Sequence, residues 1–336
     1  MPPLKIRRID WSAPRAAQQL AALRELFTDP GDAQPLSARD RKLSQAAFGE
    51  VLTPARAVER ICTDVRDQGV KAVLRYTEQF DRAKLTPETL RVPEEELARA
   101  LAEADPEFVE TVRAVRERVM SFQLGILHTS AVLPVMGQSE LHLRYRPMRR
   151  VGVCVPGGAA AYPSTLLMTV CPAQAAGVRE IAVVMPPTPL GAYNPDLLAV
   201  CEILGVKEVY RMGGAQAVAA LAYGVEGVPP VDMIVGPGNL YVTLAKKFVS
   251  GRVGIDCLAG PSEIVVAADS AAQPAFVAGD LIAQAEHSAD AKAVLVTWHE
   301  PLLDAVQQEL ERQLRRLPRG ELARESLAKY GALVLT

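Results

Sequence analysis

The polar side chains whose spacing best suits ligand binding lie between Asp280 and Asp290. This segment begins as an apolar helix and becomes densely polar within two turns. Asp280, Gln284 and His287 follow one another at i, i+4 and i+7, which predicts that they share one helical face. Gln284 and His287, at i and i+3, can both reach one bound ion or ligand. A neutral imidazole with oxygen donors suits Zn²⁺ or another divalent ion, provided that the rest of the chain supplies more ligands.

A purely structural role explains the same histidine without any ligand. A histidine near a helix C-terminus interacts favourably with the helix dipole. The HExxH spacing of zinc-binding helices is absent. From this helix alone, the structural role is therefore favoured for His287. The other three histidines, His128, His142 and His299, lie in loop, hairpin or surface-like contexts, and we assign them no role.

A second candidate site comes from the turns that follow apolar strands. The turns are Pro156–Gly158, Gly213-Gly214 and Gly236–Gly238, with Gln216 and Asn239 as the closest polar side chains. In open α/β sheets, ligands bind outside the carboxyl ends of the strands. Glycine lets the backbone approach a ligand closely, and helix N-termini favour phosphate. These turns therefore make a dinucleotide a candidate ligand.

The spacing of these turns does not by itself establish a nucleotide site. Neither GxGxxG nor GxxxxGK[ST] occurs in the chain. Glycine and proline are ordinary residues of the turns between strands and helices, and that explanation is favoured on spacing alone. Ser262 precedes a strand and suits a turn or cap as well as a substrate contact. No Ser-His-Asp or Cys-His order stands out.

The elements that would position these residues follow a repeating order. Strand, Gly/Pro turn and helix recur at intervals of about 25 residues, which predicts βα units and parallel sheets covered by helices. The predicted strands are 151–155, 180–185, 207–212, 233–235, 263–267, 292–297 and 332–335. The predicted helices between or after them are 163–176, 195–204, 215–223, 239–249, 273–287, 301–317 and 321–330. Residues 131–147 alternate around a Gly-Gln-Ser turn and predict a hairpin.

The predicted fold class is α/β, with two Rossmann-like parallel-sheet domains and an N-terminal helical arm. Residues 1–52 form the arm, which is too small to hold a core alone. Residues 53–148 together with 262–336 form the first α/β domain, and residues 149–261 form the second, on the NAD side. Thr53-Pro54 predicts a helix start at the entry to the first domain. The strand-like run 332–336 ends the sequence where a helix normally follows, so we interpret the chain as cut short.

Composition excludes several classes of protein. The 336 residues are 49% hydrophobic and 23% charged, with a net charge of −2, which is typical of a soluble globular protein. The charge gives no reason to expect nucleic acid or an anionic membrane as a partner. No apolar run reaches the roughly 18 residues of a membrane helix, and no signal-peptide pattern follows the N-terminus. The five cysteines are scattered, with no CxxC pair. An odd count in a long chain without a signal peptide predicts reduced thiols in the cytoplasm. We interpret all five as buried apolar fillers.

Together, the turns and the polar helix carry a family resemblance. The motifs occur in order as Val151–Gly158, Gly213–Ala217, Gly236–Asn239, Ala259–Glu263 and Gln284–His287. With them the chain resembles histidinol dehydrogenases. Asp64–Arg66 with Gly69, and Tyr76-Thr77 with Phe80-Asp81, also match the N-terminal helices of that family. The resemblance covers essentially the whole chain, and five motifs in the right order make it specific.

The resemblance implies an enzyme that oxidises L-histidinol to L-histidine through an aldehyde in two NAD⁺-dependent steps, at the end of histidine biosynthesis. It implies a homodimer with one Zn²⁺ per site. Carried over by motif, Gln284 and His287 match zinc ligands that also contact substrate, and Ser262 matches a substrate contact. Gln216 and Asn239 match NAD contacts. On the basis of this resemblance, a zinc-ligand role for His287 is favoured over a purely structural one.

The sequence departs from the family pattern in two respects. Cys154 stands where the family usually has a tyrosine that contacts NAD. The family's catalytic Glu-His pair, and an aspartate and a histidine that complete the zinc site, come later than Thr336; Glu286-His287 is not that pair. The chain alone is therefore expected to hold zinc weakly and to turn over little. The alternatives are an inactive short paralogue that acts as a binding or assembly partner, and a dehydrogenase of the same fold for another amino alcohol.

Overall fold

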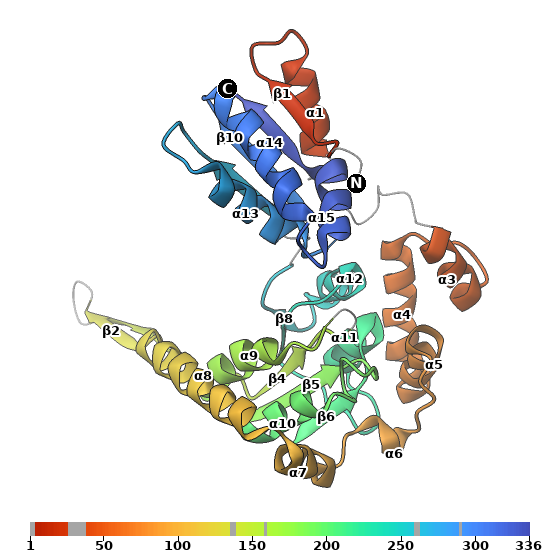
Figure 1. The fold of residues 1–336 in the computed structure, drawn as a ribbon. Helices are drawn as coiled ribbons and strands as arrows, with labels where there is room; N and C mark the ends of the chain where they lie inside the picture. Colours follow the sequence, from red (N-terminus) through yellow and green to blue (C-terminus); the bar gives the residue numbers. More distant parts are fainter. Residues whose placement is uncertain (1–3, 26–37, 135–138, 158–159, 259–262, 289–290) are drawn as a thin grey trace. The chain divides into compact units, whose positions relative to one another are not determined.

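The computed structural model describes residues 4–25, 38–134, 139–157, 160–258, 263–288 and 291–336. They belong to two compact units, a larger one of residues 34–258 and a smaller one of residues 1–33 with 259–336. Each unit contains a parallel β-sheet with helices on its faces (Figure 1). This confirms the predicted α/β class.

The sheet of the larger unit has five parallel strands in the order β6-β5-β4-β7-β8. The strands are β4 Arg150–Cys154, β5 Glu180–Met185, β6 Glu208–Arg211, β7 Met233–Val235 and β8 Gly254–Ile255. The helices that alternate with them are α9 Pro163–Ala175, α10 Pro195–Ile203, α11 Gly214–Tyr223 and α12 Leu240–Val249. The chain adds strands on one side of β4 and then on the other. The order therefore reverses between β4 and β7, as in a doubly wound nucleotide-binding sheet.

Alternation along the strands divides the larger unit into two cores. Val151 and Val153 of β4 pack with α9 and α10, whereas Cys154 packs on the other face with α11 and α12. Successive side chains of a strand point to opposite faces, so one β4 sequence serves both cores. Because both faces are covered, the strands are almost continuously apolar.

Helices that precede the sheet in sequence belong to the same two cores. They are α3 Ala38–Phe48, α4 Pro54–Gln68, α5 Val70–Asp81, the short α6 Pro87–Leu90, α7 Glu94–Glu103 and α8 Pro106–Gly125. Helix α4 begins where the sequence predicts, since the Thr53 side chain accepts a hydrogen bond from the Arg56 backbone N–H. Apolar faces of α4 and α5 pack with α11 and α12, while α7 and α8 pack on the other side.

This packing differs from the predicted grouping of residues 53–148 with 262–336. Val58 and Ile61 of α4 share a core with Ala217 and Leu221 of α11, and residues 34–258 form one unit. The sequence pattern identified the apolar faces of these helices but not which sheet they cover. The remaining predicted domain boundaries stay a prediction.

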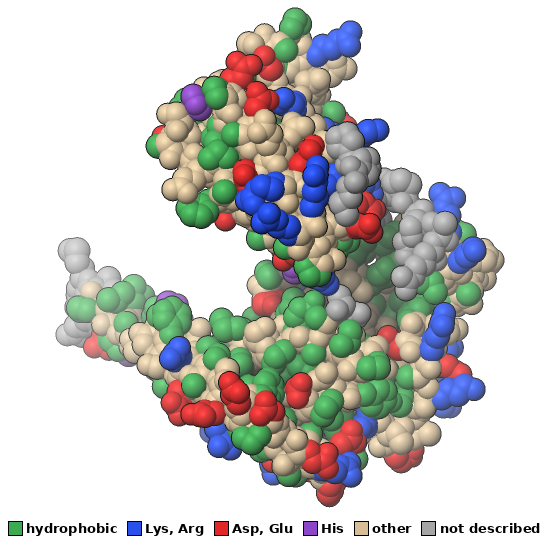
Figure 2. All heavy atoms as spheres, in the orientation of Figure 1, with side chains coloured by type: hydrophobic (Ala, Val, Ile, Leu, Met, Phe, Trp, Pro, Cys, Tyr) green, Lys and Arg blue, Asp and Glu red, His purple; other side chains and the backbone are tan. Residues whose placement is uncertain are grey.

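A projection extends from the larger unit, formed by α8 and a hairpin of β2 Ala131–Pro134 with β3 Glu140–Leu143 (Figure 1). The strands pair antiparallel, with Leu133 opposite Leu141, which confirms the predicted hairpin. Apolar side chains cover much of this projection (Figure 2). Leu133 and Leu141 are more than half exposed, so the hairpin has an apolar surface that its own unit does not bury.

Four parallel strands in the order β1-β11-β10-β9 form the sheet of the smaller unit. They are β1 Arg7–Asp10, β9 Glu263–Ala267, β10 Lys292–Thr297 and β11 Ala332–Leu335. The helices are α1 Ala16–Glu25, α13 Pro274–Ala285, α14 Glu300–Leu314 and α15 Gly320–Tyr330. Leu333 packs towards α13–α15, whereas Ala332 and Val334 pack towards α1. The final strand is therefore sandwiched between helices.

Strand β1 was not among the predicted elements. Its sequence, Arg-Arg-Ile-Asp, contains one apolar residue, Ile9, and no alternation long enough to detect. It is a strand because its backbone pairs with β11, with Ile9 opposite Val334. Residues of the predicted N-terminal arm thus complete a sheet made mostly of residues more than 250 positions later.

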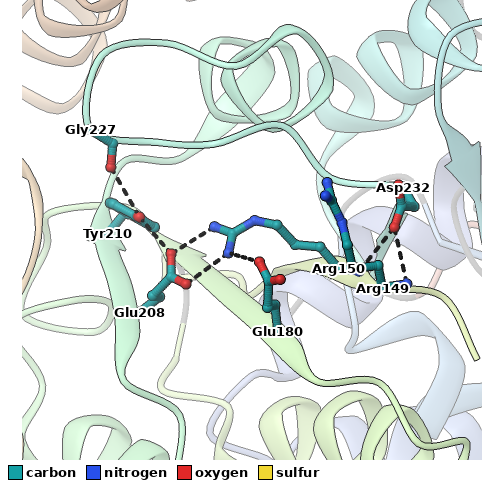
Figure 3. A network of polar contacts seen from close by, with 7 residues as sticks. All are labelled: Arg149, Arg150, Glu180, Glu208, Tyr210, Gly227 and Asp232. Atoms are coloured by element: carbon teal, nitrogen blue, oxygen red, sulfur yellow. Dashed lines mark hydrogen bonds and ion pairs between the residues drawn. The ribbon is translucent and has the colours of Figure 1, made fainter.

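A buried arginine ties together the amino ends of three strands in the larger unit (Figure 3). The Arg150 guanidinium donates to both carboxylate oxygens of Glu208, at 2.7 and 2.6 Å, and to Glu180 at 3.2 Å. The Tyr210 hydroxyl donates to Glu208 at 2.8 Å and lies 3.1 Å from the Gly227 carbonyl oxygen. The pKa of Glu208 is lowered, chiefly by its hydrogen bonds to Arg150. This network fixes the sheet at the end opposite the carboxyl-end turns.

Candidate functional site

The larger unit contains a cavity of about 540 Å³ at the carboxyl ends of its strands. One wall comes from the turns after β4, β6 and β7, and the other comes from α3, α4 and α5. Gln216, Asn239 and Cys154, the three residues predicted to contact a cofactor, all line it. The structure thus brings together residues that are up to 85 positions apart in the sequence.

The cavity lies where the strand order reverses. Gly157 follows β4, and Pro237 and Gly238 follow β7, its neighbour on the other side of the reversal. At such a point the two connections leave in opposite directions and open a crevice, which is where doubly wound sheets bind ligands. The turns predicted from Gly and Pro spacing therefore form the wall of a cavity.

Two helix N-termini face the cavity. Helix α11 begins at Gly214 and contributes Gln216, which is 1% exposed, from its first turn. Helix α12 is capped by Asn239, whose side-chain oxygen accepts a hydrogen bond from the Val242 backbone N–H at 3.1 Å. The carboxamide nitrogen of Asn239 is then the group that can donate to a ligand. Two helix N-termini with backbone N–H groups suit a pyrophosphate.

Cys154 ends β4 and is buried in the cavity wall. Burial raises the pKa of the Cys154 thiol to about 12, so it is neutral at pH 7 and not a nucleophile. This agrees with its predicted role as a small apolar filler. The same prediction is wrong for Cys257, which is exposed because it lies in the loop after β8 and packs in no core.

A buried ion pair holds the turn after β7 in place. The Lys246 ammonium donates to the Gly236 carbonyl oxygen and to the Asp256 carboxylate, the latter at 2.7 Å. The other Asp256 oxygen accepts from the Gly236 backbone N–H at 2.7 Å. Both backbone groups of Gly236 are therefore fixed by one pair of side chains. This fixes the turn that leads into Pro237 and Asn239.

The helical wall of the cavity is apolar and partly aromatic. The Phe48 and Tyr76 ring centroids lie 6.1 Å apart, and the Tyr76 and Phe80 rings stack at 5.6 Å. Phe48 and Phe80 line the cavity, together with Leu43. None of these residues has a role predicted from the sequence. The available signal was the family match of Phe80-Asp81, which marked the position without indicating its function.

Asp81 is the only charged side chain among the described residues that line the cavity. It ends α5, after which Arg82 takes a left-handed conformation. Its Oδ2 is buried and has no hydrogen-bond partner among the described residues. Burial raises the pKa of Asp81 to about 6. A raised folded-state pKa means that the contribution of Asp81 to stability is present below its unfolded pKa and is lost as the pH rises through about 6.

The predicted zinc ligands lie in the smaller unit. Helix α13 ends at Ala285, with Glu286 as its C-cap, so Gln284 is in the last helical turn. His287 lies in the turn beyond it and is exposed, and its backbone N–H donates to the Gln284 carbonyl oxygen at 3.2 Å. The two residues are therefore adjacent but not on one continuous helix as predicted. Ser262 lies outside the described residues.

The described residues include two neighbouring side chains with donor atoms, Gln284 and His287. Gln284 can contribute an amide oxygen and His287 an imidazole nitrogen, and the imidazole is a common zinc ligand. Within the described part of the chain, no three His, Cys, Asp or Glu side chains gather as a metal site. The donors present thus fit part of a zinc site.

The described helices include none long and apolar enough to cross a membrane.

Comparisons with known proteins agree with these features. Residues 48–336 match the family model described as histidinol dehydrogenase. The chain is 57% identical over 326 residues to a histidinol dehydrogenase of Rhodopirellula baltica, covering 97% of this chain and 70% of that protein. It is 50% identical over 286 residues to one from Moorella thermoacetica, covering 84% and 66%.

A solved structure supports the same assignment. The fold matches the crystal structure of histidinol dehydrogenase from Elizabethkingia anophelis with a TM-score of 0.82 and 31% identity, covering 100% of this chain and 72% of that one. The chain spans about two thirds of the length of the relatives it matches. The family model, the sequence relatives and the matched fold lead to one conclusion: this chain belongs to the histidinol dehydrogenase family.

Proposed function

We propose that this chain is the cofactor-binding part, and a portion of the substrate-binding part, of an enzyme that oxidises L-histidinol to L-histidine in histidine biosynthesis. The first step converts the alcohol and NAD⁺ to the aldehyde L-histidinal, NADH and a proton. The second adds water to the aldehyde and transfers another hydride to a second NAD⁺, giving the carboxylate. The cytoplasm is the proposed compartment.

The observation that carries this proposal is the cavity at the strand reversal, which collects Gln216, Asn239 and Cys154. We infer that NAD⁺ binds there, with its pyrophosphate at the N-termini of α11 and α12. The Asn239 amide and buried Gln216 would orient the dinucleotide. Cys154, in place of a tyrosine, would contribute only packing and backbone contacts at this position.

NAD⁺ binding to the 336-residue chain tests the cofactor site. Replacing Gln216 with alanine is expected to raise the Kd for NAD⁺ about tenfold, because a buried amide that hydrogen-bonds a ligand is worth about 1–3 kcal/mol. Isothermal titration calorimetry measures this directly. Gln68→Ala, an exposed glutamine in the same unit, is the matched control and should leave the Kd unchanged. Failure of the unmodified chain to bind NAD⁺ would reject the cofactor site.

We further propose that Gln284 and His287 are two of the ligands of a catalytic Zn²⁺. When bound, the metal would act as a Lewis acid that holds the substrate imidazole and amine. Ser262 would contact the same substrate. Among the described residues these two ligands leave the site incomplete, so we expect the 336-residue chain alone to hold zinc weakly. Little or no turnover by this chain in isolation is part of the proposal.

Replacing His287 with asparagine, in the gene as its organism expresses it, is expected to lower zinc content and activity together. Loss of one ligand weakens a four-coordinate site strongly, and both readouts depend on the same metal. Elemental analysis of the purified protein and NAD⁺-dependent histidinol oxidation measure the two effects. His299→Asn serves as the control in the same unit. Unchanged metal content would remove His287 from the ligand set.

An inactive paralogue is the second candidate, favoured only by the incomplete ligand set in the described residues. It predicts NAD⁺ binding without turnover even when zinc is supplied in excess. NAD⁺-dependent oxidation of L-histidinol by the chain alone would reject it. Comparing kcat/KM across amino alcohols would then distinguish histidinol from another substrate of similar chemistry.

We propose that a second copy of the chain covers the projection formed by α8 and the β2–β3 hairpin. Its exposed apolar side chains include Phe122, Leu133 and Leu141, which are 63%, 56% and 61% exposed. Contiguous exposed apolar surface of this kind marks interaction sites, and homodimers bury the most apolar interfaces.

Introducing aspartate at both Leu133 and Leu141 is expected to convert the dimer to a monomer. The two residues are directly opposite each other on the hairpin, so the substitutions place two charges in one patch that the second copy would have to desolvate. Light scattering coupled to size-exclusion chromatography gives the mass. Val51→Asp, at a half-exposed apolar residue outside the projection, should leave the mass unchanged. A dimer that survives the double substitution would place the interface elsewhere.

A further inference from the structure

We propose that Asp81 binds the ribose hydroxyls of the adenosine half of NAD⁺ and makes the cavity select NAD⁺ over NADP⁺. This inference rests on the proposed cofactor site and assigns a residue to its specificity. The Asp81 carboxylate faces the cavity, and one of its oxygens has no hydrogen-bond partner in the part of the chain that the structure describes.

The hydrogen bonding of Asp81 differs from that of two other carboxylates in the same unit, Asp64 and Asp256. Asp64, on α4, accepts hydrogen bonds from Arg60, Arg75 and Tyr76. Asp256 accepts from Lys246 and from two backbone N–H groups. Both are fully engaged within the protein. The buried Oδ2 of Asp81 has no such partner among the described residues, and the Asp81 side chain lines the cavity, so its unmet hydrogen bond is assigned to a molecule bound there.

The surroundings of Asp81 suit an uncharged ring with a donor group attached. Phe80 precedes it and stacks on Tyr76, which in turn contacts Phe48. Leu43 lines the same wall. Flat apolar side chains of this kind pack well against adenine. A carboxylate at the edge of such a surface accepts hydrogen bonds from a ribose diol, the role that an acidic residue plays in dinucleotide-binding folds.

Selectivity follows from the charges that line the cavity. The phosphate on the 2′-hydroxyl of NADP⁺ removes one donor and adds negative charge close to the Asp81 carboxylate. No lysine or arginine is among the described residues that line the cavity, so none is placed to hold that phosphate. This wall therefore accepts a dinucleotide whose adenosine ribose carries an uncharged 2′-hydroxyl. The wall combines an attractive contact for NAD⁺ with a repulsive one for NADP⁺.

Calorimetric titration of the 336-residue chain with NAD⁺ and NADP⁺ tests the inference. The unmodified chain is expected to bind NAD⁺ at least about tenfold more tightly than NADP⁺. In Asp81→Asn, the Kd for NAD⁺ should rise about tenfold and the preference for NAD⁺ over NADP⁺ should shrink by a similar factor. Glu78→Gln, an exposed carboxylate on the same helix, is the matched control and should change neither value.

Binding of two cofactor fragments, 5′-AMP and nicotinamide mononucleotide, shows which half of NAD⁺ contacts Asp81. Asp81→Asn should weaken binding of 5′-AMP and leave nicotinamide mononucleotide unaffected. The reverse pattern would overturn the assignment to the adenosine half, since the carboxylate would then face the cationic nicotinamide ring. Equal affinity of the unmodified chain for NAD⁺ and NADP⁺ would also overturn the inference, without any variant.

Two further outcomes separate this inference from the proposed function. If the unmodified chain binds NAD⁺ and Gln216→Ala weakens it, while Asp81→Asn changes neither affinity nor preference, only the role of Asp81 fails. If the unmodified chain does not bind NAD⁺, the cofactor site itself fails. The melting temperature of ligand-free Asp81→Asn should equal or exceed that of the unmodified chain at pH 7.5, because the substitution removes a buried charge that no described residue pairs with. A lower melting temperature would show that Asp81 is structural.

Discussion

Replacing Glu208 with alanine is expected to destabilise the larger unit by about 3–5 kcal/mol, because it leaves the buried Arg150 guanidinium without its main partner. The side chain of Arg150 is 2% exposed, and both of its terminal nitrogens donate to Glu208. Urea unfolding followed by circular dichroism measures the loss. Trp11 and Trp298 both belong to the smaller unit. Their fluorescence therefore reports the unfolding of that unit separately.

The same network provides a matched control. Glu180 also contacts Arg150, but its side chain is 46% exposed, so Glu180→Ala is expected to cost about 1 kcal/mol or less. The double replacement Arg150→Met with Glu208→Leu should cost less than Glu208→Ala alone, since it leaves no buried charge behind. Equal losses for Glu208→Ala and Glu180→Ala would show that the buried pair adds nothing beyond a surface contact.

The pH dependence of this network has a definite sign. The folded-state pKa of Glu208 is lowered, so its stabilising contribution is fully present above the unfolded pKa of a glutamate, about 4.3, and is lost as the pH falls through the lower folded value. Asp81 acts in the opposite direction, because its pKa is raised to about 6. Ionisation of Glu208 therefore favours the folded state, whereas ionisation of Asp81 disfavours it.

Replacing Gly236 with alanine is expected to abolish NAD⁺ binding and to destabilise the larger unit by about 3 kcal/mol or more. Gly236 has a φ of 102°, which side chains rarely adopt, and an added Cβ would lie 2.3 Å from the Cys154 carbonyl oxygen. The turn after β7 would have to move, and Asn239 with it. Calorimetry with NAD⁺ and urea unfolding measure the two effects.

Gly251→Ala is the corresponding control. Nothing lies within 4 Å of a Cβ added at Gly251, and it has no positive φ, so the substitution should change stability by no more than about 0.5 kcal/mol. If Gly236→Ala bound NAD⁺ as well as the unmodified chain, the turn after β7 would not be part of the cofactor site.

Much of the fold could be predicted because its signals are local. Apolar strands followed by Gly/Pro turns and helices define the parallel units, and Thr53-Pro54 defines a helix start. Strand β1 could not be predicted, since a segment with one apolar residue becomes a strand only through pairing with β11. Which sheet α4 and α5 cover was also beyond the sequence, because an apolar helical face does not specify its partner.

In the candidate site, too, local sequence signals identify some residues, whereas only tertiary packing reveals others. Gln216 and Asn239 could be identified because they follow turns that must lie at the carboxyl ends of strands. Asp81 could not, because a carboxylate at a helix end is usually solvated, and only the packing of α3, α4 and α5 encloses it. Gln284 and His287 were expected on one helical face, but α13 ends at Ala285. Helix ends are set by capping and neighbouring packing, which periodicity does not resolve.

The pairing of β1 with β11 bears on how the chain folds as it leaves the ribosome. The larger unit is continuous in sequence and can form once residue 258 has emerged. The smaller unit has to wait, because the partner of β1 is made more than 300 residues later. Closing so long a loop is entropically unfavourable and slow relative to local contacts. During synthesis the segment that becomes β1 therefore has no partner strand until β11 has been made, and over this interval its unpaired backbone is open to pairing with other chains.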